Sequence, residues 1–264
     1  MAEMKSLELF DLKGQVAIVT GAARGLGRQM AMALAQANAS IAFCDLLEEE
    51  SRETQKEIEA LGGKCYFDRV DVTQSEQIET FVVDVKNHFG RIDILVNNVG
   101  IESEGVAIEE VDDDLWRKII DTNMSSMFYV SKAVGKAMIA QGQGGSIINM
   151  SSISGLIISK IFPRHNVTYG VSKAGIAHLT RGLASEWAQY GIRVNALAPG
   201  YMMTANTATS RKFPEIVERL TEMTPMHRYG EEWELKGAVV FLASKASTYM
   251  TGSILVIDGG NTIW

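Results

Sequence analysis

The sequence is poor in the residues that mark several classes of protein. Its 264 residues include only 2 cysteines, Cys44 and Cys65. They are too few for a disulfide framework and lack the spacing of metal ligands. The 4 histidines form no HxxxH pair, so we expect no metal site. With 4 prolines and no low-complexity linker, the chain offers no flexible joint between domains. We therefore expect a single domain over residues 1–264.

Basic tracts and long apolar stretches are missing as well. The formal net charge is -7 and no run of Lys or Arg stands out, so nucleic acid and anionic membranes are not expected as partners. The longest apolar stretches are far shorter than a membrane span. The first residues, MAEMKSLELFDLKG, contain no apolar core of a signal peptide. These features predict a cytoplasmic protein.

What the chain does have is a regular alternation of short β-branched runs with longer amphipathic stretches. Runs such as VAIVT, IDILVN and SIINM are almost continuously apolar, which is typical of parallel strands buried on both faces. We expect strands at residues 15–20, 40–44, 64–69, 92–97, 145–149, 193–198 and 253–257. We expect helices at residues 25–37, 47–61, 75–89, 112–140, 169–190 and 231–243. This order predicts an α/β fold: a single-domain, Rossmann-type, doubly wound parallel sheet of about seven strands with helices on both faces.

Ligands of such sheets bind at the carboxyl ends of the strands, so these ends were searched for polar motifs. The first strand ends in a loop with Gly21, Gly25 and Gly27, spaced GxxxGxG. Glycines let the backbone turn tightly and approach a pyrophosphate, and the following helix directs its N-terminal amides at the negative charge. The loop predicts dinucleotide binding; the alternative is an ordinary strand-to-helix turn.

The second strand is followed by Asp45. A carboxylate at this point can accept hydrogen bonds from both adenosine ribose hydroxyls and would repel a 2′-phosphate, which favours NAD over NADP. Arg24 favours NADP instead, because a basic residue in the glycine loop could hold a 2′-phosphate. The alternative for Asp45 is a cap on the helix that begins near Leu47.

Taken together in this order, the motifs resemble the short-chain dehydrogenases/reductases from about Gly14 to Gly260. The matching pieces are TGAARGLG at 20–27, which includes Arg24 and Leu26, then Asp71-Val72, NNVG at 97–100, Asn123, Ser152, the Tyr169/Lys173 pair and Pro199-Gly200-x-x-x-Thr204. A single Tyr-x-x-x-Lys pair arises often by chance, so the ordered combination carries the resemblance.

The resemblance implies roles for the residues outside the glycine loop. Asp71 and Val72 would flank the adenine, and Asn98 would steady the centre of the sheet, with Gly100 beside the cofactor. Pro199 would precede the part of the chain where the backbone near Met202 and the hydroxyl of Thr204 hold the nicotinamide carboxamide and the phosphate. Val99 departs from the family, which usually has Ala there, and would slightly crowd the adenosine side.

The resemblance also implies the chemistry. Tyr169 and Lys173 are four residues apart and share a helix face. An ammonium and an oxidised nicotinamide nearby would lower the tyrosine pKa and make Tyr169 a usable acid/base near neutral pH. Ser152, rather than the competing Ser151 and Ser154, would hydrogen-bond the substrate oxygen. Asn123 would hold a water that links Lys173 to solvent.

Substrate choice is expected to lie in residues 201–228, a lid segment. Its methionines suit an apolar lining or ordinary helix packing, and its basic residues could receive a carboxylate or sugar hydroxyls, or form a solvated face. The chain looks like members that act on polyols, ketoses and sugar acids, such as the gluconate, mannitol and sorbitol dehydrogenases. Hydroxysteroid or 3-oxoacyl substrates are an alternative. A non-catalytic dinucleotide-binding regulator is an alternative of another class, although such proteins typically lose the catalytic residues, which are all present here.

Two further expectations concern the parts around the site. Arg164, His165 and Asn166 lie in a stretch that is longer than usual for the family, and either contact the substrate or form a solvated turn. Family members usually form homotetramers, which fits the apolar faces of the helices at 112–140 and 169–190. We expect Trp264 to pack into a subunit interface.

Overall fold

The structure is a computed structural model that describes residues 5–102, 106–158, 166–205, 207–208 and 210–263. The predictions for Arg164, His165 and Trp264 fall outside these residues. The described chain forms one seven-stranded sheet in the order β3-β2-β1-β4-β5-β6-β7, with every neighbouring pair parallel. The strands are β1 Val16–Thr20, β2 Ser40–Asp45, β3 Cys65–Arg69, β4 Ile94–Asn97, β5 Gly145–Met150, β6 Ile192–Pro199 and β7 Ile254–Ile257. The predicted doubly wound parallel sheet is confirmed.

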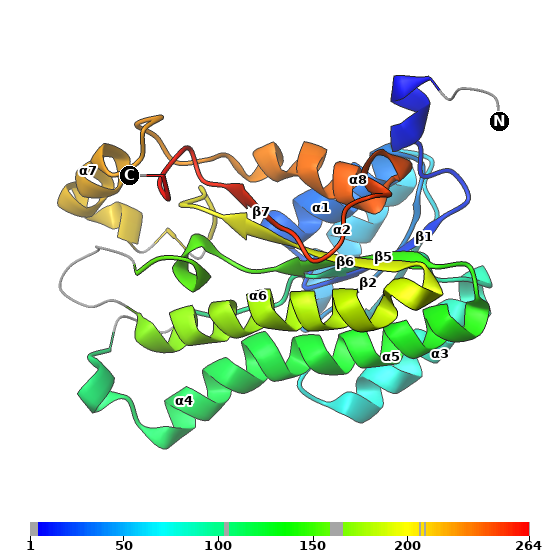
Figure 1. Ribbon diagram of the computed structural model, residues 1–264, viewed down its shortest axis with the longest axis horizontal. Coiled ribbons are helices and arrows are strands. Elements are labelled where there is room, and N and C mark those ends of the chain that lie inside the picture. The colour runs from blue at the N-terminus through cyan, green and yellow to red at the C-terminus, as the bar shows by residue number, and fades with distance from the viewer. Residues whose placement is uncertain (1–4, 103–105, 159–165, 206, 209, 264) are drawn as a thin grey trace.

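Helices cover both faces of the sheet (Figure 1). They are α1 Gly25–Gln36, α2 Glu48–Ala60, α3 Ser75–Phe89, α4 Asp113–Ile120, α5 Ser126–Gln141, α6 Val167–Trp187, α7 Pro214–Glu222 and α8 Lys236–Ala243. Helices α1, α2 and α8 lie on one face, and α3, α5 and α6 on the other (Figure 1). The chain order changes direction between β1 and β4, so the switch point of the fold lies there.

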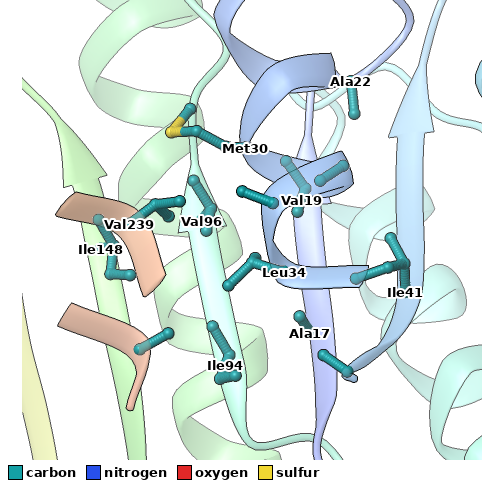
Figure 2. Packing of buried hydrophobic residues seen from close by; sticks show 14 of the residues in the cluster. Ala17, Val19, Ala22, Met30, Leu34, Ile41, Ile94, Val96, Ile148 and Val239 are labelled. Atoms are coloured by element: carbon teal, nitrogen blue, oxygen red, sulfur yellow. The ribbon is translucent and has the colours of Figure 1, made fainter. Parts of the chain in front are cut away.

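Two apolar clusters hold these layers together, and strands β1 to β6 contribute to both because successive side chains point to opposite faces. Val19 of β1 packs with Met30 and Leu34 of α1 in one cluster, together with Ile94, Ile148 and Val239 (Figure 2). Ile18, its neighbour along β1, belongs to the second cluster with side chains of α3, α5 and α6. Burial on both faces explains why the strand sequences are continuously apolar.

The structure differs from the prediction in two places that concern the site. The helix expected at 112–140 is divided into α4 and α5 by a π-helical turn, Asp121–Ser125. One extra residue in a single turn barely changes the apolar pattern, so the sequence shows a continuous helix. Helix α7 was not predicted, although Pro214 at its first turn is a common start signal. It lies within residues 201–228, at the same end of the molecule as the residues that follow β7 (Figure 1).

A search of the described helices for spans that are both long and apolar enough to cross a membrane found none.

Candidate active site

The glycine loop after β1 is a tight connection to α1. Gly21 has a φ of +69° and donates its N–H to the Cys44 carbonyl at 2.8 Å, while Gly25 has a φ of +58°. A Cβ on Gly27 would lie 2.0 Å from the Gly21 carbonyl oxygen, so only glycine lets α1 approach the strand this closely. In the described part of the chain no side chain caps the start of α1, which leaves its first amides available to an anion.

Asp45 ends β2 and is held by three backbone N–H groups. One carboxylate oxygen accepts from Ala23 in the glycine loop at 3.0 Å, and the other accepts from Leu46 at 2.7 Å and Leu47 at 3.1 Å. The alternative interpretation of Asp45 as a helix cap is wrong: the N-cap of α2 is Leu47, no described side chain caps the helix there, and Asp45 instead orders the turn before it. The same bonds fix the carboxylate at the rim of the cavity described below, where a ribose can reach it.

At the switch point, the end of β4 is tied to the end of β1. The Asn98 side chain donates to the carbonyls of Thr20 at 3.1 Å and Gly21 at 2.9 Å, as expected for a residue that steadies the sheet centre. A Cβ on Gly21 would lie 2.9 Å from the Val99 side chain, so Val99 fills the space against the glycine loop. The Val99 side chain therefore crowds the backbone of the glycine loop at Gly21.

These strand ends surround one cavity of about 930 Å³. It runs along the carboxyl edge of the sheet, from Asp45 and Asp71 after β2 and β3 to Pro199 after β6. The structure brings together sixteen of the seventeen predicted site residues in its lining: Gly21, Arg24, Gly25, Leu26, Gly27, Asp45, Asp71, Val72, Asn98, Gly100, Ser152, Tyr169, Lys173, Pro199, Met202 and Thr204. Asn123 is the exception and is buried behind the cavity wall.

Asn123 stands in the π-helical turn and joins three segments of the site. Its Oδ1 accepts from the Ile101 N–H at 2.8 Å, and its Nδ2 donates to the Ile101 carbonyl at 2.9 Å and to the Ser172 hydroxyl at 3.0 Å. The π turn directs this side chain inward between the loop after β4 and α6. The water expected between Asn123 and Lys173 stays a prediction.

Ser152 is distinguished from its neighbours by its hydrogen bonds. The Ser151 hydroxyl donates to the Lys173 carbonyl at 2.9 Å and is thereby engaged in packing β5 against α6. The Ser152 oxygen accepts the N–H of Ser154 at 3.1 Å and is hydrogen-bonded to the Tyr169 side chain, which lowers the pKa of that phenol. Ser152 is thus the serine whose hydroxyl lies beside Tyr169.

Tyr169 and Lys173 stand on one face of α6, as expected. The Lys173 Nζ donates to the Met150 carbonyl at 2.8 Å and lies 5.4 Å from the centroid of the Tyr169 ring. Burial lowers the Lys173 pKa to about 8, while the charge of Glu102 raises it. The Lys173 ammonium thus lies near the Tyr169 ring and lines the cavity, where a ribose hydroxyl could accept a hydrogen bond from it.

The expected lowering of the Tyr169 pKa is wrong for the protein's own groups. Burial raises this pKa above its ordinary value, and the negative charge of Glu102 raises it further, against the smaller effect of Ser152. The Lys173 ammonium faces the ring and the Met150 carbonyl, and its charge does not offset the burial of the phenol. The second positive charge that was expected to lower the Tyr169 pKa is that of the oxidised nicotinamide.

Only the start of the segment at 201–228 reaches the cavity. Tyr201, Met202, Thr204 and Ala205 line it, together with Thr207. The basic residues considered as carboxylate receptors lie outside the lining among the described residues. Two of them have partners elsewhere, since Arg211 donates to the Thr204 carbonyl and Arg228 pairs with Glu234; the others are Lys212, Arg219 and His227.

Sequence reasoning missed three charged residues of the cavity lining: Glu102, Lys118 and Asp121. Glu102 lines the cavity and interacts with both Tyr169 and Lys173, yet it belongs to no motif of the sequence. Its position two residues beyond the NNVG motif was the only signal that could have indicated it.

The residues that line the cavity are suited to bind each part of a nicotinamide dinucleotide. Uncapped amides at α1 suit a pyrophosphate, the fixed carboxylate of Asp45 suits a ribose, and Lys173 with Tyr169 stands at the other end of the same cavity. A dinucleotide site that ends at a serine, a tyrosine and a buried lysine defines an oxidoreductase of the Rossmann-fold class.

Comparison with known proteins assigns the family. The family model described as enoyl-(acyl carrier protein) reductase matches residues 21–262. A galactitol 2-dehydrogenase (L-tagatose-forming) of Cereibacter sphaeroides is 40% identical over 257 residues, which cover 97% of this chain and 98% of the relative. The chain belongs to the short-chain dehydrogenase/reductase family.

Solved structures agree with this assignment. A short-chain type dehydrogenase/reductase from Mycobacterium marinum superposes with a TM-score of 0.93 at 39% identity and covers 98% of this chain and 99% of that chain. A gluconate 5-dehydrogenase from Burkholderia cenocepacia J2315, solved with NADP and tartrate, has a TM-score of 0.92 at 33% identity, covering 98% of this chain and 100% of that one.

Proposed function

We propose that this protein transfers a hydride between NAD(H) and a secondary alcohol or ketone, and that its substrates are polyols, ketoses or sugar acids. The observation that carries the proposal is the meeting of Ser152, Tyr169 and Lys173 in the cavity that also contains the glycine loop. The substrate class is supported by the similarity to the galactitol and gluconate dehydrogenases.

When bound, the nicotinamide supplies or accepts the hydride. The protein's residues position the substrate and move its proton. The Ser152 hydroxyl donates a hydrogen bond to the substrate oxygen and stabilises the charge that develops there. In alcohol oxidation the Tyr169 phenolate takes the hydroxyl proton, and in ketone reduction the phenol returns it. Lys173 holds the ribose hydroxyls and, as a cation, favours the phenolate.

The proposed preference for NAD rests on Asp45. Its carboxylate is fixed by the glycine loop and by the turn before α2, so it cannot swing away from a 2′-phosphate without breaking three hydrogen bonds. Such a phosphate would meet the negative charge of a partly buried carboxylate. Arg24 is the residue that could oppose this preference, and the Burkholderia relative was solved with NADP.

Two parts of the proposal concern the surroundings of the site. We propose that residues 201–228, with α7, act as the lid over the substrate. We also propose a homotetramer, because α4, α5 and α6 form one surface on which Trp116, Phe128 and Val171 are exposed. Light scattering coupled to size exclusion would give the mass of the assembly in multiples of 28.9 kDa.

The direct test is an initial-rate panel followed at 340 nm. Purified protein is given NAD⁺ or NADP⁺ with hexitols, aldonates, hydroxysteroids and 3-hydroxyacyl thioesters, and reduced cofactor with the matching ketones. Turnover of a hexitol or an aldonate with NAD⁺ supports the proposal. Turnover restricted to steroids or thioesters would overturn the substrate class, and a folded protein that binds cofactor without any turnover would favour the regulator.

A further inference from the structure

One acidic side chain faces the reacting end of the cavity and has no part in the mechanism above. Glu102 lines the cavity and is exposed to it, and its charge acts on both Tyr169 and Lys173. Glu102 shares this lining with Tyr169 and Lys173 and follows two residues after Gly100, which passes beside the Lys173 Nζ. It therefore lies where the substrate's own hydroxyls must pass or bind.

The backbone before Glu102 is firmly placed. Ile101 forms two hydrogen bonds with the buried Asn123 side chain, at 2.8 and 2.9 Å. A Cβ on Gly100 would lie 3.2 Å from the Lys173 Nζ, so the chain passes directly beside the buried ammonium. The position of Glu102 is thus a consequence of the same Asn123 contacts that organise the catalytic residues.

The Glu102 carboxylate is free to bind a ligand as far as the described residues show. None of them forms a hydrogen bond or an ion pair with it; burial raises the Glu102 pKa, and the positive charge of Lys173 opposes this rise. An ionised carboxylate accepts hydrogen bonds and donates none. Hydroxyl groups of a polyol are matching donors, whereas a carboxylate on the substrate would be repelled.

Among the described residues, the basic side chains that line the cavity are Arg24, Lys118 and Lys173, and Lys173 is the one whose charge acts on Glu102. Arg24 and Lys118 belong to other elements of the cavity wall than Tyr169 and Lys173, which both stand on α6. Arg24 stands at the start of α1, and Lys118 belongs to α4. The basic residues of the 201–228 segment lie outside the lining, as described above.

We infer that Glu102 determines substrate charge, binding hydroxyls of uncharged polyols and ketoses and excluding sugar acids. This inference rests on the proposed function and narrows it: of the two substrate classes that the similar proteins represent, it selects the neutral one. Glu102 acts as a specificity residue that contacts substrate, and the proton transfer by Tyr169 does not need it.

The test compares D-sorbitol with D-gluconate, which share five hydroxyl-bearing carbons, including all the secondary ones, and differ at one end by CH2OH against a carboxylate. We would measure kcat/KM for both compounds with the wild type, Glu102→Gln, Glu102→Lys and Glu109→Gln, each at saturating NAD⁺. Glu109→Gln removes the same charge from an exposed residue of the short 3-10 helix Ile108–Glu110, outside the cavity lining, and is the matched control. The melting temperature of each variant reports on its folding.

We expect the wild type and Glu109→Gln to prefer sorbitol by about 10-fold or more, since a charged hydrogen bond or its loss changes binding by that order. Glu102→Gln should lower the ratio of the two kcat/KM values at least about 10-fold, and Glu102→Lys should reverse the preference. A purely structural role of Glu102 would reduce both values by the same factor and leave the ratio unchanged.

Two results would overturn the inference while leaving the proposed function intact: a wild type that prefers gluconate, or a ratio that is the same in Glu102→Gln and Glu109→Gln. If the wild type turned over no hexitol, hexonate or related ketose but did oxidise another secondary alcohol, the proposed function would fail, and the inference with it.

Discussion

Replacement of Asp45 tests how the sequence selects its cofactor. In Asp45→Ala three backbone N–H groups lose their acceptor, those of Ala23, Leu46 and Leu47. Because these groups are only partly buried and water can replace the carboxylate, we expect a loss of about 2 kcal/mol in the free energy of unfolding. In a chain of this length that corresponds to a fall of roughly 4–8 °C in melting temperature.

The effect on cofactor choice should be larger and of opposite sign for the two cofactors. NAD⁺ loses a charged hydrogen-bond acceptor for its ribose hydroxyls, so its kcat/KM should fall about 10-fold. NADP⁺ gains at least about 10-fold, because the repulsion between the carboxylate and the 2′-phosphate disappears while Arg24 remains. The ratio of NAD⁺ to NADP⁺ efficiency should therefore fall about 100-fold.

The assay is the initial rate at 340 nm with each cofactor varied at a fixed, saturating polyol. Asp45→Asn keeps the size and one acceptor oxygen and should shift the ratio less than Asp45→Ala. Asp84→Asn on α3, outside the cavity lining, removes a charge without touching the cofactor and is the control. If the ratio in Asp45→Ala stayed within threefold of the wild type, the argument from Asp45 to NAD would be refuted.

Three further predictions address the reacting centre and the loop. Tyr169→Phe should lower kcat at least about 100-fold while NADH binding, followed by fluorescence, changes less than threefold; retention of activity would remove Tyr169 from the mechanism. Because burial and the Glu102 charge raise the Tyr169 pKa, the rate of alcohol oxidation should rise with pH above neutrality, and Glu102→Gln should move that rise to lower pH. A shift to higher pH would contradict this. Gly27→Ala brings a methyl group against the Gly21 carbonyl and should cost about 1–3 kcal/mol and weaken NADH binding, whereas Gly237→Ala, which meets nothing within 4 Å, should do neither.

The sequence allowed the layers of the fold to be predicted because the strands are buried on both faces and therefore read as unbroken apolar runs. Helix α3 was predicted with its observed bounds, Ser75–Phe89, since its apolar face is regular and Gly90 ends it in a left-handed conformation. The π turn at Asn123 escaped prediction because its signal is one extra residue inside a continuous amphipathic pattern. Helix α7 was not predicted, although Pro214 at its first turn is an ordinary signal for the start of a helix.

The site was predicted where backbone geometry demands particular residue types. Gly21 and Gly27 are required by a left-handed turn and a close helix contact, and Tyr169 and Lys173 by their common helix face. Glu102 could not be predicted in this way, since only the folded chain brings it into the same cavity as Tyr169 and Lys173. The effect of the protein's own groups on the Tyr169 pKa was predicted wrongly for the same reason, because burial and the charge of Glu102 are properties of the folded cavity.

The central claim is that this cavity passes a hydride between a nicotinamide and a hydroxyl-bearing carbon of a polyol. The most direct measurement supplies a hexitol deuterated at its secondary carbons, together with oxidised cofactor, and determines the deuterium content of the reduced cofactor by mass spectrometry. We expect one deuterium per reduced cofactor with the wild type and no measurable transfer with Tyr169→Phe. Reduced cofactor without deuterium, or no reduction by any deuterated hexitol, would contradict the account.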